Sequence, residues 1–331
     1  MKARKLFHAT VAILTVLGAP AGSRAADRIL SGVNLAGAEF SSGHIPGRYG
    51  WDYSFPKDEE IAYYTSKGMS LFRLPLSWER LQPNLSGDFD PSYLSRIQSA
   101  VAAIEGAGGE VILDIHNYGK YHGQLIGSSD VPVAGFVDLW TRLAAIFGKD
   151  GKVLFGLMNE PQLASAADWA QVEQQAVDAV RKSGAVNRIL ISGVNWDGAH
   201  NFVQVNGAAL ADIHDEKRRL IFEAHQYFDA DSSGRSDVCV AQDQVVPRLS
   251  SFADWLAEHH ARGLLGEFAV GRNAQCLDDL KTAMAYVNSR PYVWYGWTYW
   301  AGGSRWGEYM YTLEPTKTGV DRPQMSVLTG R

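Results

Sequence analysis

The chain has 331 residues, of which 46% are hydrophobic and 20% are charged, and its formal net charge is −5. This composition is typical of a globular protein with a large core, and it excludes a chain that is disordered throughout. The acidic balance argues against binding to nucleic acid or to anionic membranes, because both depend on basic patches.

The first 25 residues have the pattern of a secretory signal peptide. A basic start precedes an apolar run at residues 11–17, which is too short to span a bilayer, and small residues surround Ala25. We expect cleavage after Ala25, a mature domain at residues 26–331, and secretion to the extracellular space or the periplasm. The alternative is a transmembrane anchor or a disordered tag. Cleavage leaves 27 of the 31 basic residues against 36 acidic ones, a net charge of −9.

Eight short apolar runs recur along the rest of the chain. They are rich in Val, Ile, Leu and aromatic residues without strict alternation, which is typical of strands buried on both faces. The runs cover residues 29–35, 71–76, 111–116, 153–158, 188–192, 220–225, 264–268 and 293–300. Equivalent positions lie 32 to 44 residues apart, which is the size of one βα unit.

The segments between the runs carry the signatures of amphipathic helices. Asp90 and Pro91 can cap and begin one helix, Gly148 can end a second, and Ser165 can cap a third. Eight such units predict a single (β/α)8 barrel. An open doubly wound sheet is the alternative, but no glycine-rich phosphate loop follows the first run.

The chain contains only two cysteines, Cys239 and Cys276. An even pair in an exported chain suggests a disulfide. Neither cysteine has the near neighbours that a metal site or a redox CxxC motif requires. The sequence alone does not prove that the two cysteines meet.

Functional side chains cluster where the apolar runs end. In a (β/α)8 barrel the active site lies at the carboxyl ends of the strands, so these side chains should meet at one mouth. The residues are Arg73, His116 with Asn117, Asn159 with Glu160, His225 with Tyr227, Glu267, and Trp300. Hydrolysis of a glycosidic bond needs one carboxyl to protonate the leaving oxygen and a second to attack the sugar or activate water. Glu160 and Glu267 supply that pair, and a separation of about 5 Å would indicate retention of configuration.

The neighbours of the two glutamates suggest a division of labour. Arg73 and Tyr227 can hold Glu267 ionised, whereas the negative charge of Glu267 would raise the pKa of Glu160. Asn159 can bond the sugar 2-hydroxyl, a contact that strengthens in an oxocarbenium-like transition state.

Aromatic side chains offer flat apolar surfaces to sugar rings. We expect Trp300 to lie under the sugar at the cleavage point, with Trp196 and Trp306 as further platforms, and the alternative for each is core packing. We expect no cofactor and no metal, because no His-x-His pair is present and the charge of Arg73 would repel a cation.

Seven stretches resemble glycoside hydrolase family 5, and within it the bacterial and fungal endo-β-1,4-glucanases. They are VNLAGAEF, FRLPLSWERLQP, ILDIHNYGKY, FGLMNEP, IFEAHQYFDADSSG, LLGEF and GWTYWAGG, and they cover almost the whole mature chain. The resemblance implies that Glu160 is the acid/base and Glu267 the nucleophile of a retaining enzyme. It places Arg73, His116, Asn159, His225, Tyr227 and Trp300 at the family's other active-site positions, and it supports a bridge between Cys239 and Cys276.

The expected activity is therefore endo-hydrolysis of β-1,4-glucan, soluble or amorphous, by a monomer. The same chemistry on mannan, xyloglucan or mixed-linkage glucan is the close alternative, and an exo-acting glucosidase is another. A glycan-binding barrel without catalysis is less consistent with the sequence, since both glutamates are present.

Overall fold

The structure is a computed structural model that describes residues 28–330. The predicted signal peptide at residues 1–25 lies outside the described residues. Eight parallel strands close into a barrel in the order β1-β10-β9-β8-β7-β6-β3-β2. They are β1 (Leu30–Leu35), β2 (Leu71–Leu76), β3 (Glu110–Ile115), β6 (Val153–Gly156), β7 (Ile189–Ile191), β8 (Leu220–Tyr227), β9 (Gly263–Ala269) and β10 (Trp294–Gly302).

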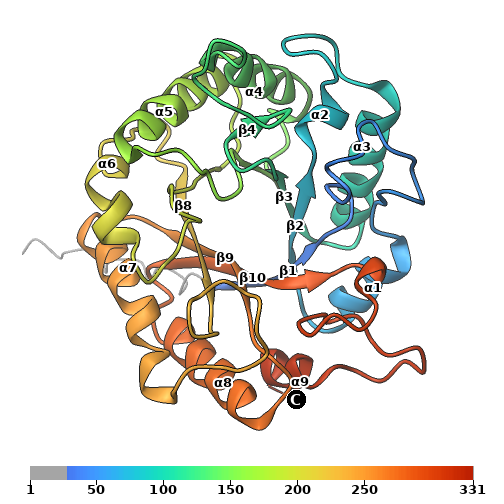
Figure 1. Ribbon diagram of the computed structural model, residues 1–331, viewed down its shortest axis with the longest axis vertical. Coiled ribbons are helices and arrows are strands. Elements are labelled where there is room, and N and C mark those ends of the chain that lie inside the picture. The colour runs from blue at the N-terminus through green and yellow to red at the C-terminus, as the bar shows by residue number, and fades with distance from the viewer. Residues whose placement is uncertain (1–27, 331) are drawn as a thin grey trace, which may run out of the picture.

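Helices form a ring around the barrel, as the view in Figure 1 shows. They are α1 (Asp58–Ser66), α2 (Trp78–Leu81), α3 (Pro91–Gly106), α4 (Val133–Phe147), α5 (Ala166–Lys182), α6 (Ala208–Leu210), α7 (Pro247–Glu258), α8 (Ala274–Asn288) and α9 (Pro323–Thr329). A hairpin of β4 (Lys120–Tyr121) and β5 (Gln124–Leu125) follows β3. The predicted (β/α)8 barrel is confirmed, and the closed sheet excludes the doubly wound alternative.

The helix boundaries follow the local chemistry predicted from the sequence. The Asp90 carboxylate accepts a hydrogen bond from the Tyr93 backbone N–H at 2.7 Å, and Pro91 begins α3. The Ser165 hydroxyl accepts a hydrogen bond from the Asp168 N–H at the start of α5, and Gly148 follows α4. These caps satisfy backbone donors that a helix start leaves without a partner.

Side chains inside the barrel are arranged in layers. A buried apolar cluster takes one residue from each of seven neighbouring strands: Leu71, Ile112, Leu154, Leu190, Ile221, Leu264 and Tyr295. Side chains two residues apart on a strand face the same side, so Arg73 follows Leu71 and Glu223 follows Ile221 on the inner face. A polar layer therefore lies directly on an apolar one, nearer the carboxyl ends of the strands.

Cys239 and Cys276 form a disulfide, with their Cα atoms 5.3 Å apart. The bond ties the segment after β8 to the first turn of α8. The bridge predicted from the sequence is confirmed. Between residues 28 and 330, no helix is both long enough and apolar enough to cross a membrane.

Loss of the disulfide should lower stability, because the bridge closes a loop over a sequence separation of 37 residues in the unfolded chain. We expect the free energy of unfolding to fall by roughly 2–4 kcal/mol in the double variant Cys239→Ser/Cys276→Ser. Denaturant unfolding with and without a reducing agent measures it. Wild-type protein should respond to the reductant and the variant should not; equal midpoints for all samples would contradict the prediction.

Candidate active site

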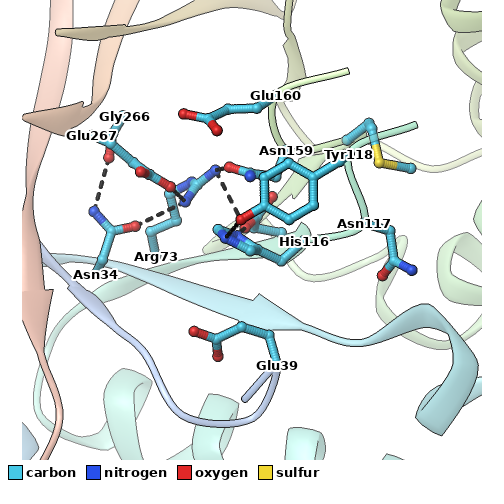
Figure 2. Close-up of polar contacts among 12 residues, drawn as sticks. Asn34, Glu39, Arg73, His116, Asn117, Tyr118, Asn159, Glu160, Gly266 and Glu267 are labelled. Atoms are coloured by element: carbon cyan, nitrogen blue, oxygen red, sulfur yellow. Dashed lines mark hydrogen bonds and ion pairs between the residues drawn. The ribbon is translucent and has the colours of Figure 1, made fainter. Parts of the chain in front are cut away.

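A fully buried arginine lies at the centre of the polar layer. Figure 2 shows the Arg73 guanidinium among side chains from several strands. Its Nη1 atom donates to Glu267 Oε1 at 2.8 Å and to Asn34 Oδ1 at 2.9 Å. Its Nη2 donates to Asn159 Oδ1 at 2.7 Å. Asp114 and Glu223 form ion pairs with the same guanidinium at 3.2 and 2.9 Å, so one cation faces three buried carboxylates.

Glu267 lies on β9 and is held as a carboxylate. The Tyr227 hydroxyl donates to its Oε2 at 2.8 Å, and His225 Nδ1 lies 3.7 Å from the same oxygen. Burial alone would raise the pKa of Glu267, but the charges of His225, Arg73 and His116 and the hydrogen bond from Tyr227 outweigh it. The pKa therefore lies below its usual value of 4.5. The sequence predicted the contributions of Arg73 and Tyr227, but not the larger one of His225.

Glu160 follows β6 and has the opposite electrostatic balance. Its backbone φ of 42° is left-handed, a conformation that is uncommon outside glycine. Its Oε1 shares a hydrogen bond with His225 Nδ1 at 2.8 Å. Burial is the main cause that raises its pKa, and the negative charge of Glu267 raises it further, while His225 opposes both. The sequence predicted the direction correctly, but it attributed to Glu267 a shift that comes mainly from burial.

The two glutamates are close together. An oxygen of Glu160, an oxygen of Glu267 and a ring nitrogen of His225 all lie within 4.8 Å of one another. Retaining glycosidases hold their carboxyl groups about 5–5.5 Å apart, whereas inverting enzymes need roughly 6.5–9.5 Å to admit a water molecule. The geometry agrees with retention.

Both histidines of the site are held by acids that the sequence analysis missed. His225 Nε2 lies 3.4 Å from Glu223, and His116 Nδ1 lies 2.8 Å from Asp114. Burial would lower the pKa of each histidine, but the neighbouring carboxylates raise it, and that of His225 lies well above its usual value. Each acid lies on a strand and precedes its histidine by two residues: His225 lies on β8, and His116 directly follows β3. The period of two could have revealed both.

The spacing of Glu160, His225 and Glu267 would also suit a metal ion. The chemistry of the donors does not favour one. Each ring nitrogen of His225 faces a glutamate, and these neighbours raise the pKa of the imidazole well above its usual value. That favours the protonated ring, which has no lone pair for a metal. The three side chains belong instead to the charge network around Arg73 and Glu223.

A cleft of about 550 Å³ opens over the glutamates. Trp300 lines it and stacks on His116, with ring centroids 5.6 Å apart and an interplanar angle of 13°. Trp196, which is 51% exposed, also lines the cleft. Trp306 does not line this cleft; it packs edge-on against Trp300 at 5.7 Å and supports that ring.

Trp196 is presented by a tightly held turn that the sequence did not predict. Asn195, Trp196 and Asp197 all have positive φ values. The buried Asp197 carboxylate accepts a hydrogen bond from the Gly193 N–H, and the Asn206 side chain bonds both backbone polar groups of Val194. These bonds fix the indole at the rim of the cleft.

Asn117 does not belong to the cleft. Its Oδ1 accepts a hydrogen bond from the Trp78 N–H and its Nδ2 donates to Glu79, both at 2.8 Å, and Figure 2 shows it apart from the glutamates. The sequence interpretation grouped it with His116 as a substrate-binding or supporting residue. Adjacent residues at a strand end face opposite sides, so Asn117 supports the start of α2 instead.

Comparisons with known proteins agree with this geometry. A family model described as cellulase, glycosyl hydrolase family 5, matches residues 31–303. Endoglucanase gh5-1 of Neurospora crassa is 36% identical over 286 residues, 86% of this chain and 72% of that protein. An endo-β-1,4-glucanase structure from Xanthomonas axonopodis pv. citri is 45% identical over 92% of this chain and 98% of its own, with a TM-score of 0.90. The structure of XacCel5A in complex with cellopentaose is 43% identical over 91% and 98%, with a TM-score of 0.89.

Replacement of Arg73 by Gln should destabilise the protein in a pH-dependent way. It leaves three buried carboxylates without their cation, which should cost about 3–5 kcal/mol at neutral pH. The lowered pKa values of Glu223 and Glu267 contribute stability that is present above the pKa of the unfolded chain and is lost as pH falls through the folded pKa. The deficit of the variant should therefore shrink below about pH 4.

Denaturant unfolding of wild type and Arg73→Gln at neutral and acidic pH tests this. Arg142→Gln is the matched control, because Arg142 pairs with Asp138 at the surface, where such pairs contribute about 1 kcal/mol or less. A deficit that is the same at both pH values would argue against the charge network.

Proposed function

This chain belongs to glycosyl hydrolase family 5, and from that premise we propose that it hydrolyses internal β-1,4 bonds of glucan by double displacement. In this proposal Glu160 is the acid/base and Glu267 the nucleophile. The observation that carries the assignment is the pair of neighbouring carboxyls whose pKa values shift in opposite directions. The raised pKa of Glu160 favours its protonated form and the lowered pKa of Glu267 favours its ionised form, as the first step requires.

In the first step the Glu267 carboxylate attacks the anomeric carbon while Glu160 gives its proton to the leaving glycosidic oxygen. The bond between the sugar and the leaving oxygen breaks, and an ester to Glu267 forms. In the second step the Glu160 carboxylate takes a proton from water, whose oxygen attacks the same carbon. The ester breaks, Glu267 returns to its ionised form, and the product keeps its original configuration.

Other side chains support these steps. Asn159 Nδ2 is buried and has no hydrogen-bond partner among the described residues, which leaves it available to a substrate hydroxyl such as the sugar 2-hydroxyl. Its Oδ1 is fixed by Arg73, so the direction of the amide is set. Trp300 offers an apolar face at the floor of the cleft, and Trp196 offers another at its rim.

The choice of glucan rests on the relatives. The Neurospora crassa protein is an endoglucanase, the Xanthomonas protein is an endo-β-1,4-glucanase, and XacCel5A binds cellopentaose. We extend that substrate class to this chain in soluble or amorphous form. Mannan, xyloglucan and mixed-linkage glucan remain the alternatives. Secretion after cleavage at Ala25 and action as a monomer complete the proposal.

Removal of either glutamate side chain should abolish most of the activity while the fold persists. We expect Glu160→Ala to lower turnover of a glucan by roughly 10²- to 10⁴-fold and Glu267→Ala by at least as much. The exposed Glu59, whose side chain is 77% accessible, provides the control Glu59→Ala. An aryl β-cellobioside with a good leaving group separates the roles: it needs no proton for departure, so Glu160→Ala should still release the aryl group and Glu267→Ala should not. Near-full glucanase activity in either variant would refute the assignment.

Viscosity loss set against reducing-end release tests the substrate and the endo mode. Carboxymethyl cellulose should lose viscosity early, when few reducing ends have formed, and galactomannan assayed in parallel should not. Activity on galactomannan alone would keep the mechanism and change the substrate. Release of reducing ends without early viscosity loss would indicate exo action, and no activity on either polymer would favour a glycan-binding protein.

A further inference from the structure

One loop of the cleft is anchored along its whole length by hydrogen bonds and a disulfide. The wall loop, defined here as residues 229–239, follows β8, and its residues 231–235 line the cleft. Asp229 is buried, and its carboxylate accepts hydrogen bonds from the backbone N–H groups of residues 234, 235 and 236 and from the Ser233 hydroxyl. The wall loop is thus folded around one acidic side chain.

Further bonds attach the wall loop to the barrel. Arg248 of α7 donates to the backbone oxygens of Asp229 and Ala230 at 2.7 and 2.9 Å and to the Ser232 hydroxyl at 2.8 Å. The Tyr311 hydroxyl donates to the Ser236 carbonyl, and the disulfide holds the last residue, Cys239. The loop is therefore held at its start, its middle and its end.

The anchored backbone lies against the ring of Tyr227. A Cβ atom placed on Gly234 would come within 2.9 Å of the Tyr227 ring, and Gly234 has a φ of 70°. Glycine is therefore required twice at this position, for the close approach and for the left-handed backbone. The ring of Tyr227 also stacks with Tyr311 at a centroid distance of 6.0 Å, so the loop and its own anchor both touch the tyrosine.

We propose that the wall loop holds the ring of Tyr227 in position and, through the hydroxyl of that ring, positions the carboxylate of Glu267. Gly234 and Tyr311 are then positioning residues for the reaction. The inference rests on the proposed function, in which Glu267 is the nucleophile. The wall loop, which faces the substrate, thus has a second role: it stabilises the ionised form of Glu267.

The test is a direct titration of Glu267 by carboxyl-carbon NMR in protein labelled at glutamate, with Glu267→Gln to assign the signal. Tyr227→Phe removes the hydrogen bond itself and should raise the pKa of Glu267 by roughly 0.5–1 unit. Gly234→Ala should also raise the pKa of Glu267, because the added methyl group displaces the Tyr227 ring. The double variant should show little more than Tyr227→Phe alone, since both changes act through one hydrogen bond.

Two further variants separate positioning from ordinary loss of stability. Gly68→Ala introduces the same left-handed alanine, with a φ of 86° and no atom within 4 Å of the new methyl group, between α1 and β2. It should leave the titration of Glu267 unchanged. Tyr311→Phe keeps both aromatic rings and removes only the bond to Ser236, so it should give a smaller shift in the same direction as Gly234→Ala.

The pH profile of kcat/KM on carboxymethyl cellulose gives the catalytic counterpart. A higher pKa for Glu267 reduces its ionised fraction in acid, so the acidic limb should move to higher pH in Gly234→Ala and stay in place in Gly68→Ala. The proposal is overturned if neither Gly234→Ala nor Tyr311→Phe shifts the titration beyond the Gly68→Ala control, or if the Gly234→Ala and Tyr227→Phe shifts add in full. The NMR titration does not depend on turnover. If the protein cleaves no glucan but shows these shifts, the proposed function is refuted and the positioning role of the wall loop is retained.

Discussion

The active site depends on one buried cation. Arg73 has no access to solvent and faces Asp114, Glu223 and Glu267, three carboxylates that could not remain buried and ionised together without it. Its two terminal nitrogens also orient Asn34 and Asn159. A planar guanidinium can serve all these partners at once because its donors have fixed directions, which an ammonium group lacks. The positions of the Glu267 carboxylate and of the Asn159 amide beside Glu160 thus follow from the same side chain.

The second constraint is the position of the positive charge of His225 among the carboxyl groups. His225 lies between Glu160 and Glu223 and also approaches Glu267, so its positive charge acts on both members of the glutamate pair. The pKa of Glu267 is lowered because Arg73 and Tyr227 also stabilise its charge. The pKa of Glu160 is raised because the effect of burial exceeds that of His225. The pKa values of two chemically identical side chains are thereby shifted in opposite directions although their oxygens lie within 4.8 Å of each other.

The sequence predicts most of the fold because the strands of a closed barrel are buried on both faces and read as apolar runs. Glu160 and Glu267 could be found because charged side chains at the ends of such runs are costly unless they have partners. Asp114 and Glu223 lie within the runs and needed the period of two to be noticed. Asn117 was grouped with His116 although neighbours on a strand diverge. The turn that presents Trp196 and the bonds of Asp229 to its own loop could not be predicted, because they depend on backbone conformations that no residue pattern specifies.

The layered interior of the barrel has a consequence for how such an enzyme can change over evolutionary time. The charge network is built mostly from strand residues, and the turn at residues 193–198 is tied to it, because the Asp197 carbonyl accepts a hydrogen bond from the His225 N–H at 2.8 Å. The exposed Trp196 side chain can change without moving this backbone, whereas replacement of the whole turn would disturb His225. Residues 229–239 are constrained in the same way, because the backbone at Gly234 lies against the ring of Tyr227, whose hydroxyl donates to Glu267. Both sides of the cleft can therefore diversify through exposed side chains more readily than through their backbones, because each backbone contacts a residue that in turn contacts Glu267.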